Sequence, residues 1–203
     1  MSARKTPPPD RRKLILYGTL TVVIVAIVAA VGFSSRVQKA ATDTPVAESK
    51  LKVGDTAPAF AVATNAGNFD LAQVSTPVLL EVFATWCPHC QRETATLNSI
   101  AAKYAGKVAL VAVSGSPYGV NGSSPETQND VNGFGEHFGV RYPVAFDPDL
   151  KVAQLYLKSG FPTLVLIDQN KKIRWMQSGE IPESDMVKAI NGVLAASRMP
   201  EHP

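Results

Sequence analysis

The sequence predicts an α/β fold in which a central mixed β-sheet carries helices on both faces. Near-continuous apolar runs, typical of buried strands, alternate with segments whose apolar residues have helical spacing. Toward its end the chain instead places two strands in succession before a final helix, which indicates an antiparallel hairpin in the sheet. Residues 51–197 are enough for one domain with a proper core.

An apolar stretch precedes this domain. Residues 14–33, LILYGTLTVVIVAIVAAVGF, include no charged residue and follow a basic tail. As a helix they would span about 30 Å, the thickness of a hydrocarbon core, and they exceed the ~7–15 residues of a signal-peptide core. We therefore expect a single-pass transmembrane helix with a cytoplasmic N-terminus and an extracytoplasmic α/β domain. The small residues Ala29, Ala30 and Ala40 leave a cleaved signal peptide as the alternative.

The domain organisation follows from these shifts in composition. We expect a cytoplasmic tail at 1–13, the transmembrane helix at 14–33, a linker at 34–50, the α/β domain at 51–197 and a C-terminal tail at 198–203. The net charge of +3 belongs to the first part, because five basic residues and one acidic residue in 1–33 give +4 and leave −1 for the rest. A nearly neutral domain argues against nucleic acid as a partner.

The elements of the domain follow in order from turn signals and periodicity. The expected strands are 77–85, 107–114, 142–147, 162–168 and 171–178, and the expected helices are 91–106, 125–138, 150–157 and 184–197. Pro125 would open the second helix, with Ser123 or Ser124 as its cap. The Gly/Ser/Pro-rich segment 114–125 before it would be a loop on the side of the sheet where the first strand ends.

Both cysteines of the chain lie in FATWCPHCQRE, residues 83–93. Cys87 ends a buried strand and begins a helix, where free backbone N–H groups and the helix dipole favour the thiolate. Pro88 suits the first helical turn because it lacks a donor that would be idle there. Cys90 lies one turn later and deeper in the protein. Cys87 is thus the expected attacking sulfur and Cys90 the resolving one.

His89 is expected to tune this pair. An imidazole close to the sulfurs favours the thiolate, above all when protonated, and so makes the disulfide more oxidising. The alternative is a solvent-exposed side chain without a tuning role.

Metal binding is not expected. Structural zinc takes four protein ligands, and the candidates are Cys87, Cys90, His89, His137 and His202. His89 sits within the turn between the cysteines, and His202 lies in the terminal tail. Outside the cytoplasm a lone CxxC is more often a redox pair, and a bridge closing four residues would add little stability as a structural disulfide.

The motif resembles thioredoxin-fold proteins, and specifically their membrane-tethered TlpA/ResA branch. The matching segments are VLLEVFATWCPHCQRE (78–93), VGDTAPAFAVATNAGNFDL (53–71) and FDPDLKVAQLYLKSGFPTLVLID (146–168). The resemblance covers about residues 51–197. It implies a thioredoxin-like fold and a thiol–disulfide oxidoreductase whose only redox group is the Cys87–Cys90 disulfide, without a further cofactor.

The resemblance also implies a substrate-binding role for GFPT. Pro162 matches the cis-proline whose neighbouring backbone pairs with an incoming peptide beside the disulfide. Phe161 would contact the partner, and Thr163 would face the cysteines with them. The loop 114–125 is a further candidate for partner recognition.

Two carboxylates and a tryptophan match positions around the cysteines. Glu81 stands where thioredoxins keep a buried acid that moves protons for the resolving cysteine, and its apolar neighbours predict a raised pKa. Its alternative is a side chain at the sheet edge. Glu93 matches the glutamate that TlpA/ResA-like proteins keep near the active site, and its alternative is a solvated helix face. Trp86 is expected to cover the sulfurs.

The resemblance implies that the substrates are protein thiols and disulfides, with apocytochrome c as one candidate. It also implies a membrane redox partner that recycles the active site. The direction of electron flow stays open. Pro-His between the cysteines is the pairing of DsbA-like oxidants, whereas the scaffold is that of the reductase branch.

Two rival functions also stay open. A peroxiredoxin-like peroxidase would share the opening of the domain, although Ala84 occupies the position of the threonine that this chemistry needs. A copper-binding chaperone of the same fold is the other rival.

Overall fold

A computed structural model describes residues 48–197. The expected tail 1–13, the expected transmembrane helix 14–33, most of the linker 34–50 and the tail 198–203 lie outside the described residues. Among the helices of residues 48–197, none is long and apolar enough to cross a membrane.

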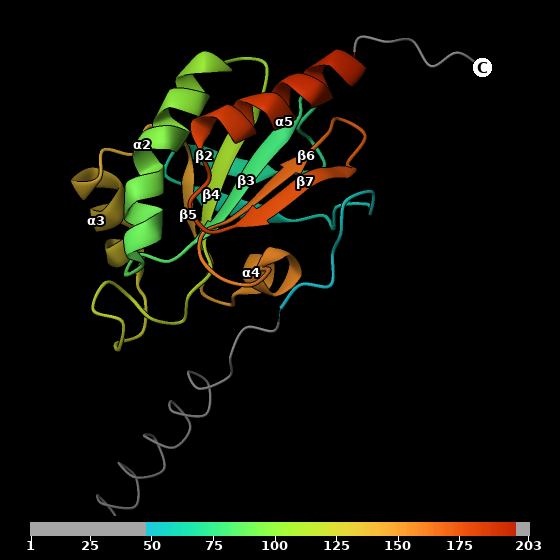
Figure 1. Ribbon diagram of the computed structural model, residues 1–203. Coiled ribbons are helices and arrows are strands. Elements are labelled where there is room, and N and C mark those ends of the chain that lie inside the picture. Colours follow the sequence, from blue (N-terminus) through green and yellow to red (C-terminus); the bar gives the residue numbers. More distant parts are fainter. Residues whose placement is uncertain (1–47, 198–203) are drawn as a thin grey trace, which may run out of the picture. The chain divides into compact units, whose positions relative to one another are not determined.

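The described part of the chain forms a seven-stranded mixed sheet (Figure 1). Its order is β2-β1-β5-β4-β3-β6-β7. The strands are β1 (Ala61–Thr64), β2 (Gly67–Asp70), β3 (Val78–Phe83), β4 (Ala109–Ser114), β5 (Val144–Phe146), β6 (Thr163–Ile167) and β7 (Ile173–Ser178). The pairs β3–β4 and β4–β5 are parallel, and the other neighbours are antiparallel. The thioredoxin-like α/β fold with a mixed sheet is confirmed.

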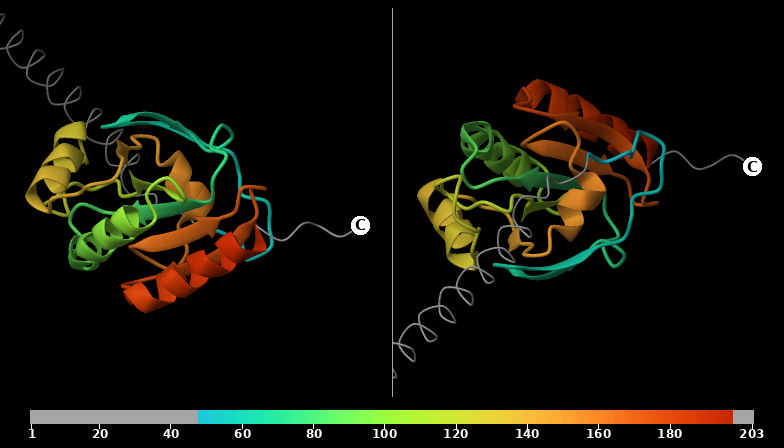
Figure 2. Two further views of the ribbon diagram at one scale, coloured as in Figure 1. Left: turned by 90° about the horizontal axis from the view of Figure 1, so that it is seen from above. Right: turned by 90° about the horizontal axis from the view of Figure 1, so that it is seen from below.

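Helices cover both faces of this sheet, as the two views of Figure 2 show. They are α2 (Pro88–Lys103), α3 (Gln128–His137), α4 (Lys151–Tyr156) and α5 (Glu183–Ala196). Apolar side chains of α2, α3 and α5 form one core with one face of the sheet. Side chains of α4 and of the segment that leads into β1 form a second core on the other face.

Strand β3 lies near the middle of the sheet, and all six of its residues are buried. Because side chains alternate along a strand, Leu79 and Phe83 join the core under α2, whereas Leu80 and Val82 join the opposite core. Glu81 has the same parity as Leu79 and Phe83, so it points toward α2. The strand thus aims a carboxylate at the helix that carries the cysteines.

Helix α3 begins later than the sequence indicates. It starts at Gln128 with Thr127 as its N-cap, not at Pro125 with a serine cap. The Thr127 hydroxyl accepts from the Asp130 N–H at 3.3 Å, and the Asp130 carboxylate accepts from the Thr127 N–H at 2.8 Å. This capping box satisfies two backbone N–H groups at the start of the helix, those of Thr127 and Asp130. Pro125 instead forms an isolated bridge with Tyr118 inside the preceding loop.

Candidate active site at the cysteine pair

The two cysteines lie where β3 gives way to α2. Cys87 is the N-cap of α2 in an extended conformation, with Pro88 following in the first turn. Its N–H donates to the Ala84 carbonyl at 3.1 Å, which closes the turn between strand and helix. Both cysteines are free thiols and buried, and Cys90 is fully enclosed. Only Cys87 is accessible at all, with 4% of its surface exposed.

The surroundings move the pKa values of the two thiols in opposite directions. The Cys90 thiol donates to Cys87 and, against the effect of burial, lowers the pKa of Cys87 to about 6. The backbone N–H groups of Cys90 and His89 and the charge of His89 act in the same direction. Burial, followed by the hydrogen bond to Cys87, raises the pKa of Cys90 far above its ordinary value. These opposite shifts favour Cys87 as the thiolate and Cys90 as the thiol.

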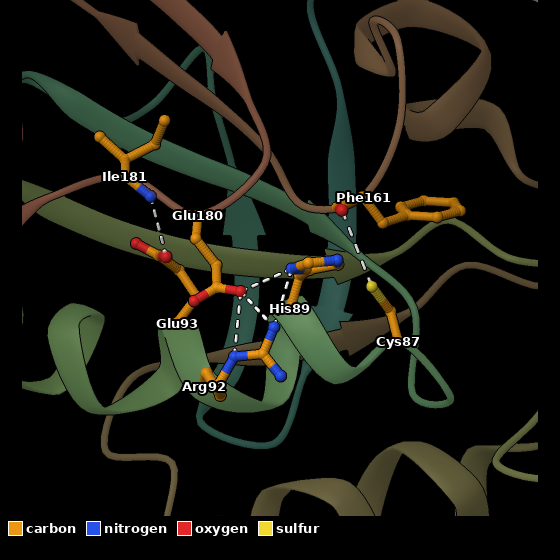
Figure 3. A network of polar contacts seen from close by, with 7 residues as sticks. All are labelled: Cys87, His89, Arg92, Glu93, Phe161, Glu180 and Ile181. Atoms are coloured by element: carbon orange, nitrogen blue, oxygen red, sulfur yellow. Dashed lines mark hydrogen bonds and ion pairs between the residues drawn. The ribbon is translucent and has the colours of Figure 1, made fainter.

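A cis peptide bond joins Phe161 and Pro162 beside Cys87. The Cys87 sulfur lies 3.7 Å from the Phe161 carbonyl oxygen (Figure 3). Trp86 is 36% exposed, packs edge-to-face on the Phe161 ring with centroids 6.0 Å apart, and donates from Nε1 to the Ser116 hydroxyl at 2.7 Å. Trp86 and Phe161 thus form an apolar wall next to the reactive sulfur.

Thr163 differs from the expectation that it faces the cysteines with Phe161 and Pro162. Its side chain is fully buried and donates to the Gly160 carbonyl at 2.7 Å. It also accepts from the Lys158 N–H at 3.2 Å and lies 3.0 Å from the Ser178 hydroxyl. Thr163 therefore supports the cis-proline loop through hydrogen bonds within it, and its part in substrate binding stays a prediction.

Both glutamates singled out in the sequence are buried on the α2 side. Glu81 is 1% exposed and accepts from the Tyr142 hydroxyl at 3.4 Å. Burial, with the charges of Glu93 and Cys87 adding to it, raises the pKa of Glu81 to about 8. The charge of Glu81 in turn contributes to the raised pKa of Cys90. This places an acid that can hold or take a proton close to the resolving thiol.

Glu93 is 2% exposed rather than solvated on a helix face. Its Oε2 accepts from the Ile181 N–H at 3.1 Å, and burial raises its pKa to about 7. Within residues 48–197, no donor reaches Oε1 of Glu93 or Oε1 of Glu81. Each carboxyl therefore keeps one oxygen available for a proton.

A third buried carboxylate, Glu126, was missed in the sequence. It is 8% exposed, accepts from the Thr85 hydroxyl at 2.9 Å and from the Ser114 hydroxyl, and burial raises its pKa to about 7. Glu126 lies in a polar loop, so no apolar neighbour in the sequence indicates burial. The burial of Glu126 follows from the fold instead. Ser114 ends β4 beside the end of β3, and the loop that carries Glu126 folds back over both strand ends.

A polar network joins His89 to the loop between β7 and α5 (Figure 3). His89 Nδ1 lies 2.5 Å from Glu180 Oε1, and Arg92 donates to the same oxygen from Nε at 3.0 Å and from Nη2. Arg92, followed by His89, lowers the pKa of Glu180 to about 2. Neither Arg92 nor Glu180 stands out in the sequence, because Glu180 is 91 residues from His89.

A groove of about 460 Å³ opens beside this network. His89 forms one side, and the loops 159–161 and 178–180 form the other. A larger cavity of about 1000 Å³ lies between β7 and α5, and neither cysteine lines it. The smaller groove borders His89, which lies between the cysteines, and the cis-proline loop. It is therefore the candidate substrate groove.

Two further observations bear on the rival functions. In residues 48–197, no three histidine, cysteine or acidic side chains come together as a potential metal site. Ala84, three residues before Cys87, is fully buried and offers no hydroxyl to a reacting peroxide.

Comparisons with known proteins agree with this geometry. The protein-family model described as Redoxin matches residues 52–194. "Thiol-disulfide oxidoreductase ResA" of Geobacillus thermodenitrificans (strain NG80-2) is 27% identical over 176 residues, which cover 85% of this chain and 93% of the relative. The ResA of Bacillus anthracis is 30% identical over 127 residues, 61% of this chain and 68% of the relative. A solved structure, "a putative Thiol:disulfide interchange protein DsbE from Chlorobium tepidum", superposes with a TM-score of 0.63 at 30% identity, covering 71% of this chain and 99% of the other.

Proposed function

The chain belongs to the redoxin family as a TlpA/ResA-like thiol–disulfide oxidoreductase, and we propose that it reduces disulfides of extracytoplasmic proteins through its CPHC motif. The observation that carries the proposal is the Cys87 thiol. It is the more exposed of the pair, its pKa is lowered to about 6, and it contacts the carbonyl that precedes the cis-proline. A substrate backbone laid along that loop would place its disulfide next to this sulfur.

The cycle balances as a two-electron transfer. The Cys87 thiolate attacks one sulfur of a substrate disulfide, and the other substrate sulfur leaves as a thiolate and takes a proton. Cys90 then loses its proton and attacks Cys87, which releases the second substrate thiolate. The substrate is reduced to a dithiol, and Cys87–Cys90 is oxidised to a disulfide.

We assign Glu81 the proton of Cys90. The charge of the Cys87 thiolate contributes to the raised pKa of Glu81, and the mixed disulfide removes that charge. Glu81 then ionises more readily at the moment when Cys90 must lose its proton. Glu93 would buffer the same buried region, because its pKa is raised to about 7 and one of its oxygens is free.

The reducing direction rests on the Cys87 pKa and the scaffold. A more stable thiolate means a more stable reduced form and a stronger oxidant. The Cys87 pKa of about 6 lies closer to the value of about 7 in thioredoxin than to about 3.5 in DsbA. We propose proteins with cysteine pairs, apocytochrome c among them, as substrates, and a membrane redox protein as the partner that reduces the site again. No cofactor beyond the cysteine pair enters this cycle.

Trapping of the mixed disulfide tests the proposal. In Cys90→Ala the resolving thiol is missing, so we expect covalent adducts at Cys87 that dithiothreitol removes on a gel. Cys87→Ala is the matched control and should trap nothing. A Cys90→Ala variant without adducts, or a Cys87→Ala variant with the same adducts, would overturn the assigned roles.

A further inference from the structure

The loop between β7 and α5 contacts three parts of the active site through three consecutive residues. These residues contact the carbonyl of the cis-proline, the exposed His89 between the cysteines, and the buried carboxylate of Glu93 in α2. The contacts are Gly179 N–H to the Pro162 carbonyl at 2.8 Å, Glu180 Oε1 to His89 Nδ1 at 2.5 Å, and Ile181 N–H to Glu93 Oε2 at 3.1 Å. Gly179 has φ +90°, a conformation that glycine adopts readily, and this turn directs Glu180 toward α2.

Glu180 is an acidic side chain that contacts two basic side chains of α2, His89 and Arg92; these three residues form the charged corner beside the cysteines. One carboxylate oxygen, Oε1, contacts both His89 and Arg92, which lie three residues apart on the first turns of α2 (Figure 3). Arg92 and His89 lower the pKa of Glu180 to about 2, so this carboxylate is ionised at neutral pH. The α2 residues in this corner therefore have a permanent negative counter-charge.

Of the three charged side chains, His89 and Arg92 lie within electrostatic range of Cys87. The Cys87 thiolate contributes to the raised pKa of Arg92, and His89 contributes to the lowered pKa of Cys87. Arg92, and His89 in its protonated form, favour the thiolate, whereas the Glu180 carboxylate that contacts both side chains offsets part of their field. The anionic groups that face this corner are the Cys87 thiolate itself, Glu180 and, behind Glu180, Glu93.

We propose that Glu180 sets the reduction potential of the CPHC site. It is a positioning residue for His89 and Arg92: its carboxylate holds both side chains and offsets their charge, which makes the disulfide a weaker oxidant than the Pro-His dipeptide alone would give. The inference rests on the proposed function, since it concerns the redox equilibrium of the same cysteine pair. It accounts for an oxidant-like motif on a reductase-like scaffold.

The equilibrium with glutathione measures this effect. One oxidised protein and two glutathione thiols give one reduced protein and one glutathione disulfide, and a larger equilibrium constant means a stronger oxidant. Glu180→Gln removes one negative charge near the thiolate. We expect the constant at pH 7 to rise about fivefold, which corresponds to about 20 mV.

Four further variants make the test specific to the charge of Glu180. Glu180→Asp keeps the charge, and we expect its constant to stay within about twofold of the unsubstituted protein. Arg92→Gln should lower the constant, and the double variant Arg92→Gln with Glu180→Gln should return close to the starting value, because both members of the pair are gone. Glu183→Gln removes the same charge at the start of α5, where Glu183 lies 3.8 Å from Lys103, and should leave the constant unchanged.

The Cys87 thiolate gives a second readout that needs no exchange partner. Its absorbance near 240 nm, followed against pH, should give a lower Cys87 pKa in Glu180→Gln and a higher one in Arg92→Gln. The inference is overturned if Glu180→Gln leaves both readouts unchanged, if Glu183→Gln changes them equally, or if Glu180→Asp behaves like Glu180→Gln. The proposed function fails separately, through absence of the trapped adducts, and the thiolate titration still decides the role of Glu180 in that case.

Discussion

Cys87 and Cys90 are three residues apart, yet their thiols have very different acidities. Cys87 caps a helix and accepts a hydrogen bond from Cys90, whereas Cys90 is fully enclosed next to Glu81. The spacing and the strand-to-helix setting allow these roles to be predicted from the sequence. Arg92 and Glu180 could not be found in the same way, because their contact depends on how a distant loop packs on α2.

Glu81→Gln tests proton transfer at the residue scale. Glutamine keeps the size of the side chain and cannot take the proton of Cys90, so we expect resolution of the mixed disulfide to slow by about a hundredfold or more, since general base catalysis typically contributes at least that much. Rapid mixing with a peptide disulfide, followed by acid quenching, measures the intermediate. Formation of the mixed disulfide should keep its rate, and Glu183→Gln should resolve normally. Equal resolution rates in Glu81→Gln and the unsubstituted protein would exclude Glu81 as the proton acceptor.

Glu126 predicts a pH dependence of stability. Its folded pKa of about 7 lies above the unfolded value of 4.5, so its protonated form is favoured by folding. The stability from this group is fully present below pH 4.5 and is lost as the pH rises through about 7. The Glu126→Gln side chain cannot ionise. Between pH 5 and pH 8 the free energy of unfolding of this variant should therefore fall by roughly 2 kcal/mol less than that of the unsubstituted protein. Denaturant titrations at both pH values measure this, and an unchanged difference would contradict the burial of an ionisable Glu126.

At the element scale, the strands expected from apolar runs match β3 to β7, whereas β1 and β2 are not among them and the polar loop before α3 hides the start of that helix. Strand β3 is buried on both faces, and its sequence shows this directly. The start of α3 depends on which of several serines and threonines binds the backbone, and that choice follows from the path of the loop. The same loop path buries Glu126 and brings Ser116 to Trp86.

Thr127→Ala tests the observed helix start. Removal of an N-cap side chain commonly costs about 1 kcal/mol, so we expect a loss of that size in the free energy of unfolding. Ser123→Ala is the matched control, since Ser123 is exposed and lies before the helix. We expect a change below about 0.5 kcal/mol there. A larger loss from Ser123→Ala than from Thr127→Ala would restore the cap expected from the sequence.

At the scale of the whole molecule, the sheet separates two cores and carries the chemistry at one end. The parallel pair β3–β4 brings Cys87, the loop after Ser114 and the start of α2 together, and antiparallel β6 adds the cis-proline loop. The sequence predicts this architecture because it depends on the order of the elements. It does not predict the groove charges, because they depend on loops that meet only in the folded domain.

The compartment is a prediction for the intact chain. We expect residues 1–50 fused to alkaline phosphatase, which is active only outside the cytoplasm, to give full phosphatase activity in bacteria. A fusion in which Ile24 and Val28 are both replaced by aspartate should lose that activity, since charges at the centre of the apolar stretch each oppose insertion by about 3 kcal/mol. An inactive fusion of residues 1–50 would place the CPHC site in the cytoplasm and contradict the proposed substrates.

The reduction potential of the Cys87–Cys90 pair tests the central claim most directly. We predict a single two-electron equilibrium with glutathione, with a potential between the roughly −270 mV of thioredoxin and the roughly −180 mV of protein disulfide isomerase. Such a value fits a reductant in which the Glu180 carboxylate offsets the effect of His89 on the Cys87 thiolate. A potential near −120 mV, as in DsbA, would contradict the reducing role, and a pair that does not exchange with glutathione would contradict the redox site itself.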